Sequence, residues 1–597
     1  MSDSIDEQLL DYYQRELTWL RHAGAGFAAR YPKVARRLEL APGECPDPHV
    51  ERLLEGFSLL AARLQRRLDD DYAEFSDALL EQLYPLALRP LPSCAIVQFA
   101  PDPSKGNLAE GYRLPRDTPL FVTTQDGASI HFRSSADAHL WPLQISEALL
   151  LDGDESQALT GVAHAGSALR LSLRCLDGCA WPELSIRSLR LHLAASPVVN
   201  ASLYDLLGAH AIQVLCGPAG STPQVLAGLP QPVGFAPDES LLPDENGLHP
   251  GLRLLAEYFA FADKFAFFDV PLQAPAEDCA EQYLYIVFDR APSTRISLQA
   301  SDIALGCAPV INLFPRTSEP LRPDGTRSEY RLVADSHREN SVEIHSLHSL
   351  RASSPAGVQR VPAYYGYQHG TGDNRLYWHA RRIVGLTPNR LGSDLLLSLV
   401  DTHFDPLHDA PEYSLTAELL CTNRHLAETL GAGTRLHFER PGPVAHARLR
   451  NPPTPQSLPK LSGQSRWRLV SQLTLNHLSL VEGPQALEAL REMLALHNLR
   501  DEASARRQIA GLLSIDSTRI VARVGEDAWR GWRNGLQVRV SLDPQHFVGS
   551  SAVLFAAVLA QFFSLYASAN RFVSTVLVQG DKEIKAWQPQ AGRPLVL

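Results

Sequence analysis

Three short groups of residues have the side chains from which a metal site or an acid–base site could be built. In the first group, His345 and His348 are three residues apart and close to Glu343, so on a helix they could share one face and bind a metal. Residues 341–344 alternate as in a strand, however, and residues three apart on a strand point to opposite faces. We therefore expect no metal at these residues.

The other two groups are weaker candidates. Residues 403–409 bring two histidines and two aspartates together around Pro406, and a solvated loop explains this composition best. Cys175 and Cys179 are the only closely spaced pair among the eight cysteines, and no second pair follows at zinc-site spacing. We expect both to be buried as small apolar residues, and the dilute cysteines fit a reducing cytosol.

Familiar catalytic and nucleotide-binding motifs are missing from the sequence. It contains no P-loop, no glycine-rich dinucleotide motif after a strand, no nucleophile-elbow serine and no HExxH pair. The net charge of −11 argues against broad binding to nucleic-acid phosphates. We predict no catalytic residue, cofactor or metal. The alternative is a β-rich hydrolytic or carbohydrate-active enzyme with helical ends, whose site would be assembled from distant loops.

The N-terminal region is predicted to form two long helices. A helix over about 5–29 is indicated by residues spaced alternately by three and four: Leu10, Tyr13, Leu17, Leu20, Gly24, Phe27, Tyr31 and Val34. A second helix over 48–84 carries an apolar stripe: Leu53, Phe57, Leu60, Leu64, Leu68, Tyr72, Phe75, Leu79 and Leu83. Such helices either dock another chain or pack within their own domain as a hairpin, and the spacing leaves both open.

The rest of the chain is predicted to be rich in strands and to end in a mixed unit. Short alternating runs from about 93 to 450 predict antiparallel strands with long loops, and the four prolines of 451–464 predict a linker. Beyond it we expect helices at 484–498, 502–511 and 551–568 and strands at 518–524, 537–542 and 572–578. The fold class is therefore α+β, with a helical region 1–92, a β-rich region 93–450 that we expect to divide into two subdomains near 236–251, and a mixed region 465–597.

Two strongly apolar segments must be covered by something. Val553–Ala567 is too short to cross a bilayer and contains Gln561, so we expect a core helix, covered by its own domain or by a partner, rather than a membrane anchor. The six aromatic residues of 257–269 exceed what the inward face of one strand uses, so they are either buried on two faces or meet another chain. Lys264, with Asp263 and Asp269, predicts an ion pair at the edge of this patch. The polar, acidic segment 1–11 is unlike a signal peptide.

A set of motifs resembles the TssF (ImpG/VasA) family of type VI secretion baseplate subunits, in order and over essentially the full length. The most specific block is Asp47–Phe57, and Ala262 stands where the family has proline. The other matching blocks are 12–17, 27–28, 31–35, 83–85, 257–259, 264–265, 312–314, 421–424, 467–471, 475–476, 547–549, 570–572 and 587–594.

The resemblance implies a cytoplasmic, non-catalytic wedge protein similar to those of contractile phage baseplates, assembled at the inner face of the cytoplasmic membrane. Its expected partners are TssG-like, TssK-like and TssE-like subunits, the VgrG hub and a second copy of itself, without nucleic acid or membrane insertion. Helices of the TssF and TssG families are expected to bundle together. The candidate partner-binding residues are therefore Leu10, Tyr13, Leu17, Leu20, Phe27, Arg52, Glu55 and Phe57.

Overall fold

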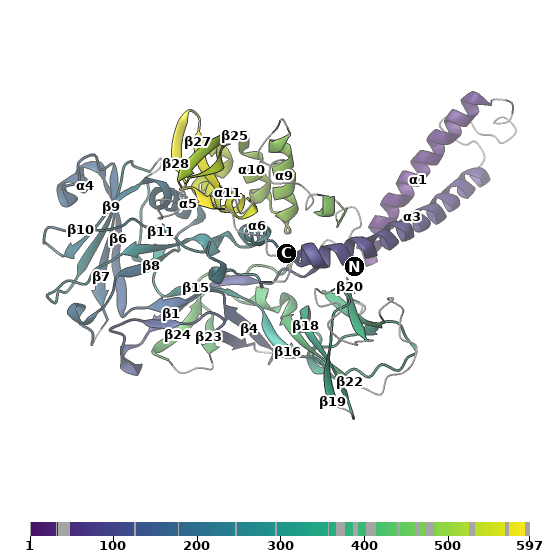
Figure 1. Ribbon diagram of the computed structural model, residues 1–597, viewed down its shortest axis with the longest axis horizontal. Coiled ribbons are helices and arrows are strands. Elements are labelled where there is room, and N and C mark those ends of the chain that lie inside the picture. The colour runs from purple at the N-terminus through teal and green to yellow at the C-terminus, as the bar shows by residue number, and fades with distance from the viewer. Residues whose placement is uncertain are drawn as a thin grey trace. The chain divides into compact units, whose positions relative to one another are not determined.

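The computed structural model describes the chain in two compact units (Figure 1). The helical unit comprises residues 1–82, 387–390 and 460–473, and the body comprises 83–386, 391–459 and 474–597. The described residues are all except 1, 32, 34–47, 125–126, 177, 245–247, 293–294, 356, 366–375, 386–391, 402–413, 439–441, 460–465, 468, 472–482, 484, 524–531, 568–571 and 592–597.

The helical unit is built on α1 (Ser2–Arg30) and α3 (Pro48–Leu83). Both predicted helices are confirmed, and α3 continues through Asp69–Asp71 as one rod of about 54 Å at 1.5 Å per residue. Arg466 forms an ion pair with Asp77 at 2.8 Å, which ties the short segment after residue 465 to α3.

The centre of the body is a closed six-stranded barrel whose strands come from widely separated parts of the chain. In barrel order they are β1 (Cys94–Pro101), β15 (Cys307–Ile311), β4 (Ser129–Ser134), β3 (Pro119–Thr123), β23 (Arg435–Phe438) and β24 (Val444–Leu449). Alternate residues such as Val97, Phe99 and Phe132 fill its interior. Two long insertions leave this barrel, one between β4 and β15 and one between β15 and β23.

The first insertion (residues 135–306) forms two sheets. One has the order β10 (Gln224–Leu226), β9 (Ala211–Pro218), β13 (Gln282–Phe288), β7 (Ser167–Cys175) and β6 (Leu143–Asp152). The other has the order β11 (Gln231–Pro232), β12 (Phe267–Pro271), β8 (Ser188–Leu193) and β14 (Ile303–Ala304). Its helices are α4 (Gly153–Thr160), α5 (Pro197–Asp205) and α6 (Pro250–Ala260), and β5 (Ala138–Leu140) pairs with β2 (Tyr112–Leu114).

The second insertion (residues 312–434) also forms two sheets around a shared apolar core. The larger sheet has the order β16 (Phe314–Thr317), β22 (Ser414–Thr422), β18 (Glu343–Ser354) and β19 (Gly357–Val361). The smaller has the order β17 (Tyr330–Arg331), β21 (Ser393–Val400) and β20 (Tyr377–Val384). The predicted strand at Glu343 is therefore confirmed, and the polar cluster at 403–409 lies outside the described residues.

The C-terminal part is the predicted mixture of helices and strands. It contains α9 (Ala486–His497), α10 (Ala503–Ala510), β25 (Leu512–Arg523), β26 (Trp532–Leu542), α11 (Ala552–Tyr566), β27 (Phe572–Gln579), β28 (Lys582–Ala586) and β29 (Gln590–Ala591). The apolar helix α11 is buried against α5, α6 and β27, so other elements of the chain cover it. Among the described residues, no helix is both long and apolar enough to span a membrane.

Of the two alternatives left open for the aromatic run, burial is the one that the structure bears out. The run ends α6, passes through a short turn and enters β12, so its rings reach several parts of one core and all six are buried. Two other expectations from sequence are wrong in detail. Lys264 pairs with Glu257 instead of an aspartate, and both groups are fully buried rather than at an edge. Cys175 and Cys179 are half-exposed, because they lie at and beyond the end of β7.

The predicted linker is also more ordered than expected over its described part, residues 451–459. Asn451 accepts a hydrogen bond from the Ile96 amide at 2.7 Å, and Thr454 accepts one from the Cys94 amide at 2.9 Å. Leu91 and Ser457 exchange two backbone hydrogen bonds. Prolines remove backbone donors but leave carbonyls and side chains free to bond, so this segment lies along the barrel as a strap.

Candidate interaction surface and buried polar junction

The helical unit presents a band of apolar side chains to solvent along α3. Four residues spaced alternately by four and three are each between 59% and 72% exposed: Leu53, Phe57, Leu60 and Leu64. Elsewhere around the helix, Ser58 and Ala62 are completely buried, so that side is covered. The four residues, called the α3 band below, form an uncovered row with the spacing of a helix–helix contact.

The predicted seam on α1 is only partly accessible. Tyr13, Leu17 and Leu20 are half-buried, whereas Leu10 and Phe27 are exposed. Trp19, which the predicted seam does not include, is also exposed. The middle of the α1 seam therefore contributes mainly to the unit's own packing. Its members Leu10 and Phe27 are exposed, as is Trp19 beside it.

The predicted residues of α3 lie on different sides of the helix. Arg52 is exposed and Glu55 is half-buried, while Phe57 belongs to the α3 band. Leu60 and Leu64 were not predicted as partner-binding residues although they continue the same stripe. The signal for them was present in the sequence, but the stripe alone did not reveal which part of it is uncovered.

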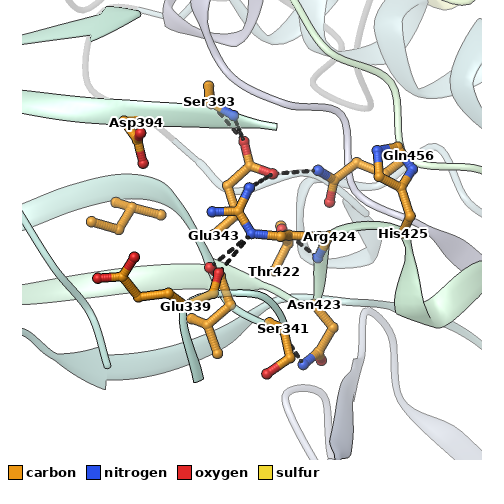
Figure 2. A network of polar contacts seen from close by, with 12 residues as sticks. Glu339, Ser341, Glu343, Ser393, Asp394, Thr422, Asn423, Arg424, His425 and Gln456 are labelled. Atoms are coloured by element: carbon orange, nitrogen blue, oxygen red, sulfur yellow. Dashed lines mark hydrogen bonds and ion pairs between the residues drawn. The ribbon is translucent and has the colours of Figure 1, made fainter. Parts of the chain in front are cut away.

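A buried polar junction lies where the second insertion meets the barrel (Figure 2). The fully buried Glu343 carboxylate accepts hydrogen bonds from the Ser393 amide at 2.8 Å and from Gln456 Nε2 at 2.7 Å. Arg424 Nη1 lies 3.6 Å from the same carboxylate, and Arg424 Nε donates to the Glu339 and Val342 carbonyls at 3.1 Å each. The buried negative charge is thus compensated by an ion pair and by neutral donors.

Arg424 adopts an unusual backbone conformation to reach this position. Its φ is +52°, in the left-handed region that a non-glycine residue rarely occupies. Gly392 has φ +129°, and a Cβ at that residue would overlap the Arg424 guanidinium. A side chain at 392 is therefore excluded both by the backbone and by the close approach of the guanidinium.

A reciprocal pair of asparagines reinforces the junction. Asn312 Nδ2 donates to Asn423 Oδ1 at 2.9 Å, and the Asn423 amide donates to Asn312 Oδ1 at 2.7 Å. Asn423 Nδ2 also donates to the Ser129 and Ser341 carbonyls. Asn312 lies where the chain leaves the barrel after β15, and Asn423 lies where it returns after β22. Their hydrogen bonds therefore connect these two segments to each other and to β4.

The electrostatics of the junction favour a structural role. Burial holds the pKa of His345 well below its usual value, and Arg89, Arg382 and Arg133 lower it further, so its imidazole is neutral. The neighbouring cavity, lined by residues including Arg331 and Asp394, measures about 20 Å³ and has room for about one water molecule. Within the described ranges, no cluster of histidine, cysteine or acidic residues could hold a metal.

An uncovered apolar band such as that on α3 is a feature of a subunit that functions within a larger assembly, whereas the closed polar junction serves the fold of the body. Comparison with known families supports this class: the family model described as "Type VI secretion system, TssF" matches residues 5–594. The chain is 32% identical, over 617 residues, to the type VI secretion system component TssF1 of Pseudomonas aeruginosa, with 98% of this chain and 99% of that protein covered. The chain belongs to the TssF family and is a type VI secretion component.

Solved structures show the same fold. A chain of the TssK-TssF-TssG baseplate subcomplex of the type VI secretion system matches with a TM-score of 0.70 at 24% identity, over 90% of this chain and 99% of that one. A chain of the type VI secretion baseplate complex matches with a TM-score of 0.60 at 24% identity, over 98% and 100%. The family resemblance and the α+β fold class inferred from sequence are confirmed.

Proposed function

We propose that this chain is a non-catalytic structural subunit of the type VI secretion baseplate and that it joins its neighbours through the helical unit. The observation that carries the proposal is the α3 band, because a row of large apolar side chains this exposed is costly in water unless another chain covers it. The proposed location is the cytoplasm, at the inner face of the membrane.

The first proposed partner is a TssG-like subunit, held together with a TssK-like subunit. The support is that similar chains occur in a subcomplex described as containing TssK, TssF and TssG. A TssE-like subunit, the VgrG hub and a second copy of this chain are further proposed partners, supported by the family resemblance alone.

The aromatic run and α11 are buried within the body, which leaves the helical unit as the place for a partner contact. The aromatic run and α11 were the competing candidates for a partner surface, and both are covered by other elements of the body. The α3 band lacks such cover. We therefore place the partner contact on α3, with the exposed Leu10, Trp19 and Phe27 of α1 as additional candidates.

Co-expression with the TssG-like and TssK-like subunits of the same secretion system tests the proposal. Leu60→Asp places a charge in the middle of the α3 band and should reduce the co-purified partner at least about tenfold, since burying an unpaired carboxylate costs several kcal/mol. Leu159→Asp, at an exposed leucine of α4 in the body, is the matched control and should leave the yield unchanged. Normal co-purification of Leu60→Asp would show that the band is not the docking surface.

A further inference from the structure

Within the part of the chain that the structure describes, Gly56 on α3 makes no contact that explains a glycine. It lies in the interior of the helix and is exposed. Glycine destabilises a helix relative to alanine because it has more backbone freedom to lose. A Cβ built on Gly56 would meet no atom within 4 Å, and its φ is not positive, so nothing in the described part of the chain demands glycine here.

The position of Gly56 relates it to the α3 band. At 100° per residue, Gly56 lies in a row with Arg52 and Arg63, four residues before it and seven after it. This row runs parallel to the α3 band, about a quarter turn away, on the side opposite the buried Ser58. The two arginines are exposed and about 16 Å apart along the helix at 1.5 Å per residue.

The two arginines beside Gly56 have no acidic ion-pair partner among the described residues of the helical unit. Among the residues that the structure describes, no acidic side chain forms an ion pair with Arg52 or Arg63. The α3 band is thus bordered on its open side by the exposed backbone of Gly56, with the half-exposed Leu59 on the next turn and an arginine on either side along the helix. Arginine pairs well with carboxylates because its planar donors match two carboxylate oxygens.

We propose that Gly56 is the point of closest approach for a helix of a partner chain, and that this helix carries acidic side chains which pair with Arg52 and Arg63. The inference rests on the proposed function, because it takes the α3 band to be the docking surface. Absence of a Cβ lets a partner side chain or backbone approach closely, since the distance between packed helices is set by the side chains at the contact. The acidic side chains of the partner helix, by pairing with the two arginines, then determine which helix binds and in which register.

The same charges disfavour a second copy of this chain as the occupant. An antiparallel pair of α3 helices would place one arginine row against the other, and like charges facing each other at an interface are repulsive. A parallel pair would direct the arginines towards the covered side of the partner helix, where Ser58 and Ala62 are buried. A different chain with an acidic amphipathic helix satisfies both the α3 band and the arginine row.

The proposal predicts effects of opposite sign for a single methyl group. Gly56→Ala should raise the melting temperature of the chain alone, because alanine favours the helix. The same change should weaken binding to the partner about tenfold or more, since the methyl group fills the point of closest approach. Gly56→Leu should weaken binding further. A glycine with only a structural role would change stability and binding in the same direction.

The test measures the affinity of the full-length chain for the purified TssG-like subunit of the same system, at low and high salt. Arg52→Glu combined with Arg63→Glu should lower the affinity at low salt and reverse its salt dependence, because carboxylates would then face the acidic helix and salt screens that repulsion. Ser504→Ala, on the exposed surface of α10, raises helix propensity far along the chain and should alter neither affinity nor its salt dependence. Circular dichroism verifies that each variant is folded.

The outcomes separate this proposal from the proposed function. If Leu60→Asp abolishes binding while Gly56→Ala and the double arginine variant bind like wild type, the docking surface stands and the role of Gly56 and the arginines is refuted. If Leu60→Asp binds normally, the α3 band is not the docking surface, and both that surface and the role of Gly56 and the arginines are refuted. If the double arginine variant binds more tightly than wild type, the partner helix is not acidic and the proposal is likewise overturned.

Discussion

Replacing Glu343 with alanine should destabilise the second insertion far more than the same replacement at Glu147. The Glu343 carboxylate is fully buried and accepts bonds from Ser393 and Gln456 beside the buried guanidinium of Arg424. Glu147 forms its ion pair with an arginine at 2.7 Å on the surface, with half of its side chain exposed. The two replacements thus remove the same group from opposite environments.

The expected magnitudes follow from what each deletion leaves behind. Removing Glu343 leaves an arginine that is only 6% exposed without its counter-charge, and removing one member of a buried pair costs about 3–5 kcal/mol. The deletion also leaves the Ser393 and Gln456 donors without an acceptor, and each such buried donor costs about 1–3 kcal/mol if no water reaches it. This cost overlaps with that of the unpaired arginine. At the surface, water replaces the lost carboxylate, so Glu147→Ala should cost no more than about 1 kcal/mol.

Amide hydrogen exchange on β18 and β21 measures the local loss of stability around Glu343, without assuming that the whole body unfolds in one step. A loss of about 3–5 kcal/mol corresponds to an exchange rate that increases by about two to three and a half orders of magnitude, at about 1.4 kcal/mol per tenfold. Residues 454–457 of the strap should lose protection together with these strands because Gln456 shares the carboxylate. Equal exchange in the Glu343→Ala and Glu147→Ala variants would refute this account of the junction.

Three further predictions concern buried groups elsewhere in the body. Burial raises the pKa of Asp205 from 3.8 to about 6, so the folded state binds this proton more tightly and stability should fall by about 3 kcal/mol as pH rises from about 4 to about 6. Asp205→Asn should remove that slope from urea unfolding curves, and an unchanged slope would contradict the assignment. Lys264→Met should lower the thermal midpoint as expected for a loss of about 3–5 kcal/mol, because Glu257 stays buried without its partner, and adding Glu257→Gln should recover part of the loss. Tyr84→Phe should cost about 1–2 kcal/mol in urea unfolding, because the hydroxyl lies 2.7 Å from His497 Nδ1 and both rings are buried; no loss would mean that this hydrogen bond is not stabilising.

Local sequence patterns predicted the elements well because each depends on neighbours along the chain. The three-and-four spacing predicted α1 and α3, and alternation predicted the strand at Glu343. The apolar composition of 551–568 predicted a helix that must be covered, and α11 is such a helix. The aromatic run was harder, since burial on several sides hides the period that distinguishes a helix from a strand.

The candidate surface was only partly predictable, because exposure is a property of packing between distant segments. Phe57 was predicted and is exposed, but Leu60 and Leu64 continue the same stripe and were not singled out. The role proposed for Gly56 required knowing that no atom lies near its missing Cβ, which a sequence cannot show.

The sequence by itself determined the family, the long helices and the alternation of strands, since these are carried by ordered motifs and local periodicity. Only the tertiary structure decided which apolar residues the chain covers for itself and which it leaves open. It closed the barrel from strands more than 300 residues apart, and it brought Glu343 together with Arg424 and Gln456. The physical reason is that burial and pairing are settled by long-range contacts, whereas a helix or strand is already indicated by the spacing of its own side chains.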